Sequence, residues 1–407
     1  MDLKSGESTS LDGLMDKVFR ELEPRKLAEL TSSLVKFPSV NPPGEEKEVA
    51  HFIVDWFEKR GFSCTMTEAA TGRPNVEVRL EGNAEPNTKT LVFNGHTDVV
   101  PAGSDWTHDP FGGEIVDGRV YGRGAADMKG GLAAMMVTLE ALKCKAVDKL
   151  SGSIILHAVV DEETGGRRGT YHMVKRGLKA NFGVVGEPSD MAVCRAHKGN
   201  VTFEVTTHGK AAHASRPENG VNAITMMMNI LTSLQAYSDH VKSSFKHPLL
   251  GWPTVNIGVI RGGVKSNVIP DRCWIAAERR VVPPETIESV QNEIESLLKS
   301  LKDRIGDLVY DLEFVHATGA SQVSEEESVV KTLLSSLCEV TGKKGAQPQG
   351  FTATCDAYFM NSVGGIPTAI FGPGHLKDIH GPDEHVEVSE LETCAKIYAL
   401  TALKLLT

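Results

Sequence analysis

Three short apolar runs, each followed by acidic or histidine residues, constrain the fold of this chain most strongly. The runs occupy residues 91–95, 154–160 and 182–186. The residues that follow them are His96 and Asp98, then Asp161, Glu162 and Glu163, and then Glu187. Short, nearly all-apolar strands are typical of the centre of a sheet that is covered on both faces. Because helical stretches alternate with these runs, the sequence predicts an α/β domain with a largely parallel sheet.

The chain is long enough for more than one domain. With 407 residues, it exceeds the usual size of a single domain. After residue 191 the pattern changes to alternating strands and two long helices, at residues 220–237 and 285–301, which is typical of an α+β unit. We therefore expect a catalytic domain made of residues 1–191 and 307–407, with an inserted domain at residues 192–306.

Composition excludes several classes of function. The formal net charge of −10 argues against nucleic-acid binding, and no stretch approaches the ~18–20 apolar residues that span a membrane. The seven cysteines form no C-x-x-C pair, which favours reduced thiols and a cytoplasmic location. The pair Gly122 and Gly124 lacks the other residues of a phosphate-binding loop, so nucleotide binding is not expected.

Histidine and carboxylate side chains in this number are the ligands that a catalytic zinc centre requires. His96 and Asp98 lie two apart at a strand end, so the carboxylate of Asp98 is expected to accept the second N–H of the imidazole. Each residue also has a structural alternative. Asp127 follows YGRGAA at a helix start, where an aspartate is more often an N-cap. His380 is one of three histidines in HLKDIHGPDEH, which could lie on the surface.

The three successive carboxylates at residues 161–163 are unusual at the end of an apolar strand. Like charges repel strongly in a low-dielectric environment, and cations would remove this repulsion. Neighbouring residues on an extended chain point to opposite sides, so one glutamate could bind metal while the other acts as a general base. The alternative is a solvated charge run.

The joint order of these residues resembles one enzyme family. The order is H-x-D, Asp, Glu-Glu, Glu and His, within segments that read GHTDVVP, GRGAADMKGG, DEETGG, GEP, HGKAAHASRPENGVNAI and NVIPD. From about residue 38 to residue 405, the chain resembles the family of acetylornithine deacetylase, succinyl-diaminopimelate desuccinylase, aminoacylase and carboxypeptidase G.

The resemblance implies two divalent metal ions, with zinc favoured and cobalt or manganese as alternatives. The implied ligands are Asp127 as the bridge, His96 and Glu187 at one ion, and Glu163 and His380 at the other. Glu162 would be the general base, and Asp98 the partner of His96. The resemblance also implies a cis peptide bond between Asp127 and Met128.

The resemblance further implies that the insert is a ferredoxin-like domain that forms a homodimer. His213, which taken alone reads as a surface histidine, would stabilise the oxyanion in the partner's active site. Asn267 and Arg280 would bind the substrate, although Arg279 leaves the register open. The expected activity is hydrolysis of the amide bond of an N-acylated amino acid. The alternative within this chemistry is a metallodipeptidase or carboxypeptidase. A non-catalytic binding protein that keeps the fold has much less support, because no implied ligand or base is missing from the sequence.

Overall fold

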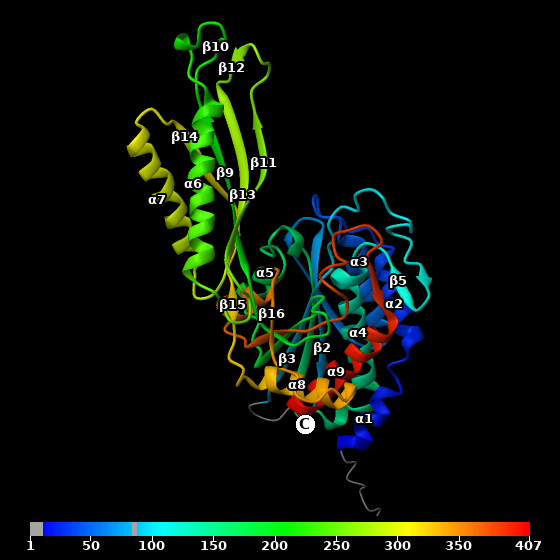
Figure 1. The fold of residues 1–407 in the computed structure, drawn as a ribbon. Helices are drawn as coiled ribbons and strands as arrows, with labels where there is room; N and C mark the ends of the chain where they lie inside the picture. The colour runs from blue at the N-terminus through cyan, green and yellow to red at the C-terminus, as the bar shows by residue number, and fades with distance from the viewer. Residues whose placement is uncertain (1–10, 84–87) are drawn as a thin grey trace, which may run out of the picture. The chain divides into compact units, whose positions relative to one another are not determined.

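The central sheet has parallel strands in its middle and antiparallel strands on both sides (Figure 1). The computed structural model describes residues 11–83 and 88–407. The strands are β1 (Ser63–Ala70), β2 (Arg73–Glu81), β3 (Thr90–His96), β6 (Ser153–Val159), β7 (Phe182–Val185), β8 (Cys194–His197) and β17 (Thr368–Ile370), with β15 (Ser321–Gln322) and β16 (Gln349–Phe351) paired to β8. Strands β6, β3, β7 and β17 are adjacent and parallel, which confirms the predicted α/β class.

Helices cover this sheet. They are α1 (Leu11–Phe19), α2 (Pro24–Val35), α3 (Lys47–Glu58), α4 (Gly130–Lys145), α5 (Thr170–Lys175), α8 (Ser328–Thr341) and α9 (Val388–Leu406). Helices α4 and α9 pack against each other and against β3. Almost every residue of α4 up to Leu142 is buried, as expected of a helix that is apolar on every side. No helix among the described residues is long and apolar enough to cross a membrane.

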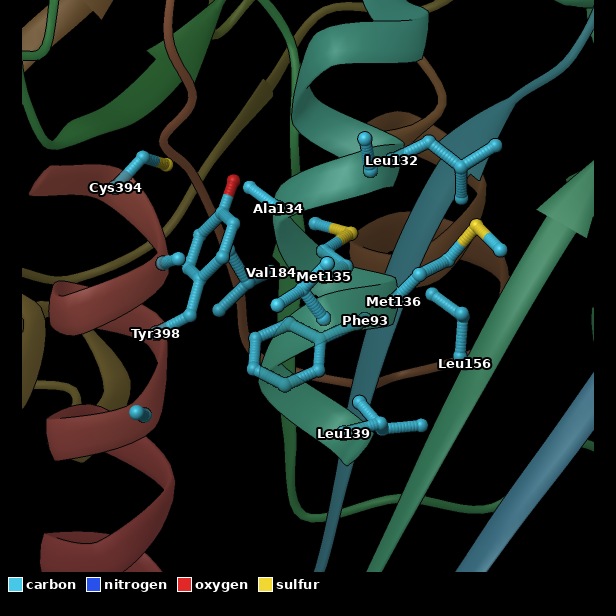
Figure 2. Close-up of a cluster of buried hydrophobic side chains, with 14 of the residues drawn as sticks. Phe93, Leu132, Ala134, Met135, Met136, Leu139, Leu156, Val184, Cys394 and Tyr398 are labelled. Atoms are coloured by element: carbon cyan, nitrogen blue, oxygen red, sulfur yellow. The ribbon is translucent and has the colours of Figure 1, made fainter. Parts of the chain in front are cut away.

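An aromatic contact joins β3 to α9 below the carboxyl end of the strand. Figure 2 shows Phe93 among Leu139, Leu156 and the ring of Tyr398, all of them fully buried. The two ring centroids are 5.2 Å apart, and the Tyr398 hydroxyl donates a hydrogen bond of 2.5 Å to the Phe371 carbonyl. A buried tyrosine hydroxyl needs such a partner. The contact holds the strand and the helix together three residues before His96.

Helix α4 approaches the strand ends closely because it begins with glycines. A Cβ atom at Gly131 would lie 2.2 Å from the Gly186 carbonyl oxygen, a distance that no side chain tolerates. Gly186 directly precedes Glu187. The glycine therefore lets the start of α4 pack against the segment that carries one of the predicted ligands.

Residues Ala196–Gln322 and Gly350–Thr354 form a second compact unit. Its elements are β9 (Gly199–His208), β10 (Ala212–His213), α6 (Ala223–Ser244), β11 (Thr254–Gly262), β12 (Val268–Ile269), β13 (Arg272–Val281), α7 (Ile287–Ile305) and β14 (Tyr310–Thr318). An antiparallel sheet of order β11-β13-β9-β14 packs against the two helices. The unit extends past the predicted end at residue 306. Residues 307–322, which the sequence assigns to the catalytic domain, include β14, and β14 pairs along β9.

Candidate metal centre

The carboxyl ends of three parallel strands bring the predicted ligands and the predicted base together. His96 is the last residue of β3, whereas residues 161–163 follow β6 and Glu187 follows β7. Strand β3 lies between β6 and β7 in the sheet, so these three ends are neighbours. Open α/β sheets place their sites at this edge.

The carboxylate of Asp127 lies between two imidazoles. Its Oδ1 is 3.0 Å from His96 Nε2, and its Oδ2 is 3.2 Å from His380 Nε2. His380 Nε2 is also 3.3 Å from Glu163 Oε2, while His96 Nε2 is 3.9 Å from Glu187 Oε1. Each oxygen of Asp127 thus faces its own histidine. This arrangement suits a carboxylate that is shared by two metal ions.

The backbone at Asp127 excludes the helix-cap alternative. The N-cap position of α4 is Lys129, two residues after Asp127, which has φ −119° and ψ 92°. The peptide bond between Asp127 and Met128 is cis, which confirms the prediction. The Asp127 side chain does not cap α4, and its two oxygens face the two histidines.

Glu162 also lies within reach of a common ion. Two sets of three side chains have ligand atoms within 4.8 Å of one another: His96, Glu162 and Glu187, and His96, Asp127 and Glu163. Both sets differ from the implied ones. The first includes Glu162, which the resemblance reserves for proton transfer, and the second joins His96 to Glu163, which the resemblance places at different ions. The distances are compatible with Glu162 as a metal ligand and with Glu162 as the general base. The metal content of variants separates the two roles.

The centre concentrates negative charge in a buried place. Burial, reinforced by Asp127, raises the pKa of Glu187 well above its ordinary value, and burial with Glu187 does the same to the pKa of Glu162. Hydrogen bonds to Asp127 and Glu163 raise the pKa of His380 to about 10. Protonated imidazoles therefore compensate the carboxylates in the metal-free protein. A bound cation would displace these protons, since a ligating histidine must be neutral.

Two buried carboxylate oxygens support a cation site. Glu163 Oε1 and Glu187 Oε1 are buried and have no hydrogen-bond partner within the part of the chain that the structure describes. An unpaired buried carboxylate oxygen is costly unless it is hydrogen-bonded or coordinates a metal. Both oxygens belong to predicted ligands, so the donor set fits divalent ions that prefer nitrogen and oxygen ligands.

Asp98 contacts His96 more closely through its backbone carbonyl than through its carboxylate, which is the group that the sequence predicts. His96 Nδ1 is 2.8 Å from the backbone carbonyl of Asp98 but 3.7 Å from its carboxylate. The Asp98 carboxylate accepts the backbone N–H groups of Glu162 and Glu163, each at 3.2 Å, and the Asn41 side chain at 2.7 Å. Asp98 therefore anchors the turn that carries the two glutamates. Asn41 lies in the turn-rich PSVNPPGEE segment, which gives no sign of a site.

Asp161 does not share in the metal centre. Its carboxylate accepts hydrogen bonds from the side chains of Arg73, Arg168 and Thr164, each at 3.0 Å. Asp161 adopts φ 74°, in the left-handed region that an aspartate tolerates better than most residues. The predicted repulsion among three carboxylates is thus partly relieved by arginines, and only two of the three reach the site.

Two predicted residues of the second unit lie side by side at a two-stranded antiparallel sheet. His213 pairs with Val268 between β10 and β12, and the Ala214 N–H donates to the Asn267 carbonyl at 3.0 Å. His213 is exposed, and its Nδ1 is 2.7 Å from the Ser215 hydroxyl. Its Nε2 is the nitrogen left for another contact.

The structure distinguishes the two neighbouring arginines. Arg279 is fully buried and forms an ion pair with Glu285. Arg280 is partly exposed; it contacts Glu278 at 2.7 Å and donates to the Thr354 hydroxyl at 3.1 Å. Arg279 is therefore held inside the fold by Glu285, whereas part of the Arg280 side chain is accessible.

Residues 92–404 match peptidase family M20/M25/M40. The chain belongs to this family. It is a metal-dependent hydrolase of amide bonds, as the resemblance implied.

Two curated relatives are similar over most of their length. The chain is 27% identical to acetylornithine deacetylase of Proteus mirabilis (strain HI4320), covering 89% of this chain and 92% of the relative. It is 31% identical to N-formyl-4-amino-5-aminomethyl-2-methylpyrimidine deformylase of Halalkalibacterium halodurans, covering 90% and 91%. Human carnosine dipeptidase 1 has the same fold, with a TM-score of 0.76 and 18% identity over 96% of this chain and 98% of that one.

Neutralising Glu187 should stabilise the metal-free protein. Because its folded-state pKa is raised, the ionised Glu187 costs stability once the pH exceeds the unfolded value of ~4.5. Glu187→Gln removes this cost, so we expect a gain in unfolding free energy on the order of 1 kcal/mol at pH 8 and none below pH ~4. Urea unfolding in the presence of a chelator measures it. Glu81→Gln, on the surface, is the control; a destabilised Glu187→Gln at pH 8 would contradict the electrostatic argument.

Proposed function

We propose that this protein is an N-acyl amino acid deacylase that works with two divalent metal ions. The position of Asp127 between His96 and His380 is the observation that carries the proposal, because each oxygen faces a different ligand. Glu187 completes one site with His96, and Glu163 completes the other with His380. Zinc is the favoured metal, with cobalt or manganese as alternatives, and the similarity to a deacetylase and a deformylase supports the acyl substrate.

Glu162 moves the proton in the proposed reaction. When bound, the two ions supply Lewis-acid chemistry, polarising the acyl carbonyl and acidifying the attacking water. The Glu162 carboxylate takes a proton from the water and returns it to the leaving amine nitrogen. The Asp98 carboxylate holds Glu162 in place by accepting the backbone N–H of Glu162.

The second unit supplies substrate contacts in this proposal. His213 donates a hydrogen bond to the developing oxyanion, Asn267 lies beside it, and Arg280 pairs with the substrate carboxylate. His213 would act in the active site of a second copy of the chain, as relatives of this family imply. A cytoplasmic location agrees with the seven free cysteines.

A metallodipeptidase or carboxypeptidase is the second candidate. The fold shared with human carnosine dipeptidase 1 favours it, and a dimetal centre that attacks an acyl carbon cleaves either kind of amide. The acyl part of the substrate distinguishes the two candidates: an amino acid leaves as the amine in both, but the acyl part carries a free amino group only in a dipeptide.

The two adjacent glutamates should respond differently to the same substitution. Glu162→Gln is expected to lower kcat by at least about 10²-fold while two ions remain bound per chain. Glu163→Gln is expected to lose one ion. Metal content by atomic spectroscopy, measured beside turnover, separates these outcomes. If Glu162→Gln also loses an ion, Glu162 is a ligand and the assigned base is wrong.

A substrate panel tests the acyl preference. The metal-loaded enzyme should hydrolyse N-acetyl, N-formyl or N-succinyl amino acids with kcat/KM at least about tenfold above that of unblocked dipeptides. Release of the free amino acid is the measurement. A preference for dipeptides would replace the deacylase with the dipeptidase, and no hydrolysis of either class by fully loaded protein would reject both.

The proposed dimer uses one edge of the second unit's sheet. Strand β11 is an edge strand that exposes Val259 and Ile260, and helix α6 beside it exposes Ile224 and Met228. Helix α7, beside the opposite edge strand β14, has no large apolar side chain among the exposed ones. An exposed apolar edge strand invites pairing with another chain. A second copy offers the same strand and helix, so the two edges match by symmetry.

A charge on β11 should therefore break the dimer. Ile260→Lys is expected to give monomers in sedimentation velocity at concentrations where the wild type is dimeric, because the lysine would be buried against its symmetry mate. Val315→Lys, on the opposite edge strand and equally exposed at 54%, is the matched control. Dimers of Ile260→Lys, or monomers of the Val315→Lys control, would exclude β11 as the specific interface.

A further inference from the structure

A buried glutamate outside the predicted ligand set accepts hydrogen bonds from the backbone at Asp127. Glu384 Oε1 accepts the backbone N–H groups of Gly124, Ala126 and Asp127, each at 3.0 Å. The Glu384 carbonyl accepts a fourth N–H, from Gly122, at 2.8 Å. Successive N–H groups that converge on one point form a concave anion site. Here the anion is a side chain of the same protein, and Asp127 is at the rim of the site.

Arg123 holds the other oxygen of this carboxylate. Its Nη1 donates to Glu384 Oε2 at 2.5 Å, and both side chains are almost completely buried. Arg123 Nη2 donates to the Ala102 carbonyl at 3.1 Å, which ties the pair to a further loop. The arginine supplies a positive charge that favours the ionised form of this buried glutamate, which burial and the neighbouring Asp127 disfavour. Both oxygens of Glu384 are thus fully engaged.

Glu384 also follows the loop that carries His380. Both His380 and Asp383 adopt positive φ, 60° and 53°, which most residues avoid. The Asp383 carboxylate accepts the N–H groups of Thr107 and His108, at 2.8 and 3.1 Å. Just after it, strand β18 (His385–Glu387) pairs with β5 (Arg119–Tyr121), which in turn pairs with β4 (Ile115–Val116). The hydrogen bonds of Asp383 and Glu384 therefore fix the strained loop on two sides.

We propose that Glu384, held by Arg123, is the positioning residue of the metal centre: it sets the place of Asp127 relative to His380 and thereby the affinity for the metal ions. The inference rests on the proposed function, since it takes Asp127 as the bridging ligand. Glu384 is completely buried, so its assigned role is to position Asp127 and not to act on the substrate. It acts through the backbone of Asp127, and residues that orient metal ligands are typically worth about 10–100-fold in metal affinity.

Glu384→Gln tests the proposal because an amide cannot replace this carboxylate. One carboxylate oxygen of Glu384 accepts from three N–H groups and the other accepts from Arg123, whereas a glutamine amide has only one oxygen that can accept. Metal-free full-length protein is titrated with Co²⁺ and followed by calorimetry and by the visible absorption of bound Co²⁺. We expect at least one of the two affinities to fall by about tenfold or more, with a changed absorption spectrum.

The matched control is Glu387→Gln. It is the same substitution three residues further on, and it also removes an ion pair with an arginine, Arg119, but it has no contact with Asp127. It should leave the Co²⁺ affinities and the spectrum unchanged. Urea unfolding of each metal-free variant reports separately on stability, so that a role in the fold alone would lower the free energy of unfolding without changing the affinity.

The outcomes separate this inference from the proposed function. Wild-type protein that binds fewer than two Co²⁺ ions would reject the dimetal proposal itself. Two ions bound by folded Glu384→Gln with wild-type affinity would overturn the positioning role. If Glu384→Gln does not fold, Arg123→Lys replaces it: lysine keeps the charge but cannot contact Glu384 and Ala102 in the same geometry. Weakened Co²⁺ binding by folded Arg123→Lys supports the role, and unchanged binding overturns it.

Discussion

The rest of the site depends on burying several carboxylates beside one another. Asp127, Glu162, Glu163 and Glu187 meet where water is scarce, and in the metal-free chain the imidazoles of His96 and His380 offset part of their charge. Such a cluster is unfavourable for folding and favourable for cation binding for the same reason, because a low dielectric strengthens repulsion and attraction alike. The fold must therefore hold these groups together by other contacts.

A second set of acids supplies those contacts. Asp98 accepts the N–H groups of the turn that holds Glu162 and Glu163, and Glu384 accepts those of the segment that holds Asp127. Asp161 closes the same turn through arginines. All three are buried, yet none is a proposed ligand. The acids at this sheet edge thus form two groups: those that face the metal centre, and those that accept backbone N–H groups of the segments that carry the proposed ligands. Sequence composition cannot separate the two groups.

The strand-end argument predicts which side chains meet because it depends on topology alone. Apolar runs followed by His96, Glu163 and Glu187 become neighbouring parallel strands, so their ends meet whatever the loop details are. The role of Asp98 was not predictable in this way, since it depends on whether the carbonyl or the carboxylate of one residue faces the imidazole. Glu384 lies in GPDEH, which reads as an exposed turn; only the three-dimensional structure reveals its burial. Strand β14 alternates like any strand, and its pairing with β9 decides its unit.

Placing the support on the backbone, and not on side chains, has a chemical consequence. A hydrogen bond to the imidazole or carboxylate of a ligand changes its basicity as well as its position, whereas a bond to the N–H of the same residue changes mainly the position. Glu384 and Asp98 bind N–H groups, so they can orient Asp127, Glu162 and Glu163 without withdrawing charge from the carboxylates. The electron-donating capacity of these oxygens remains available to the cations and to the proton that Glu162 carries.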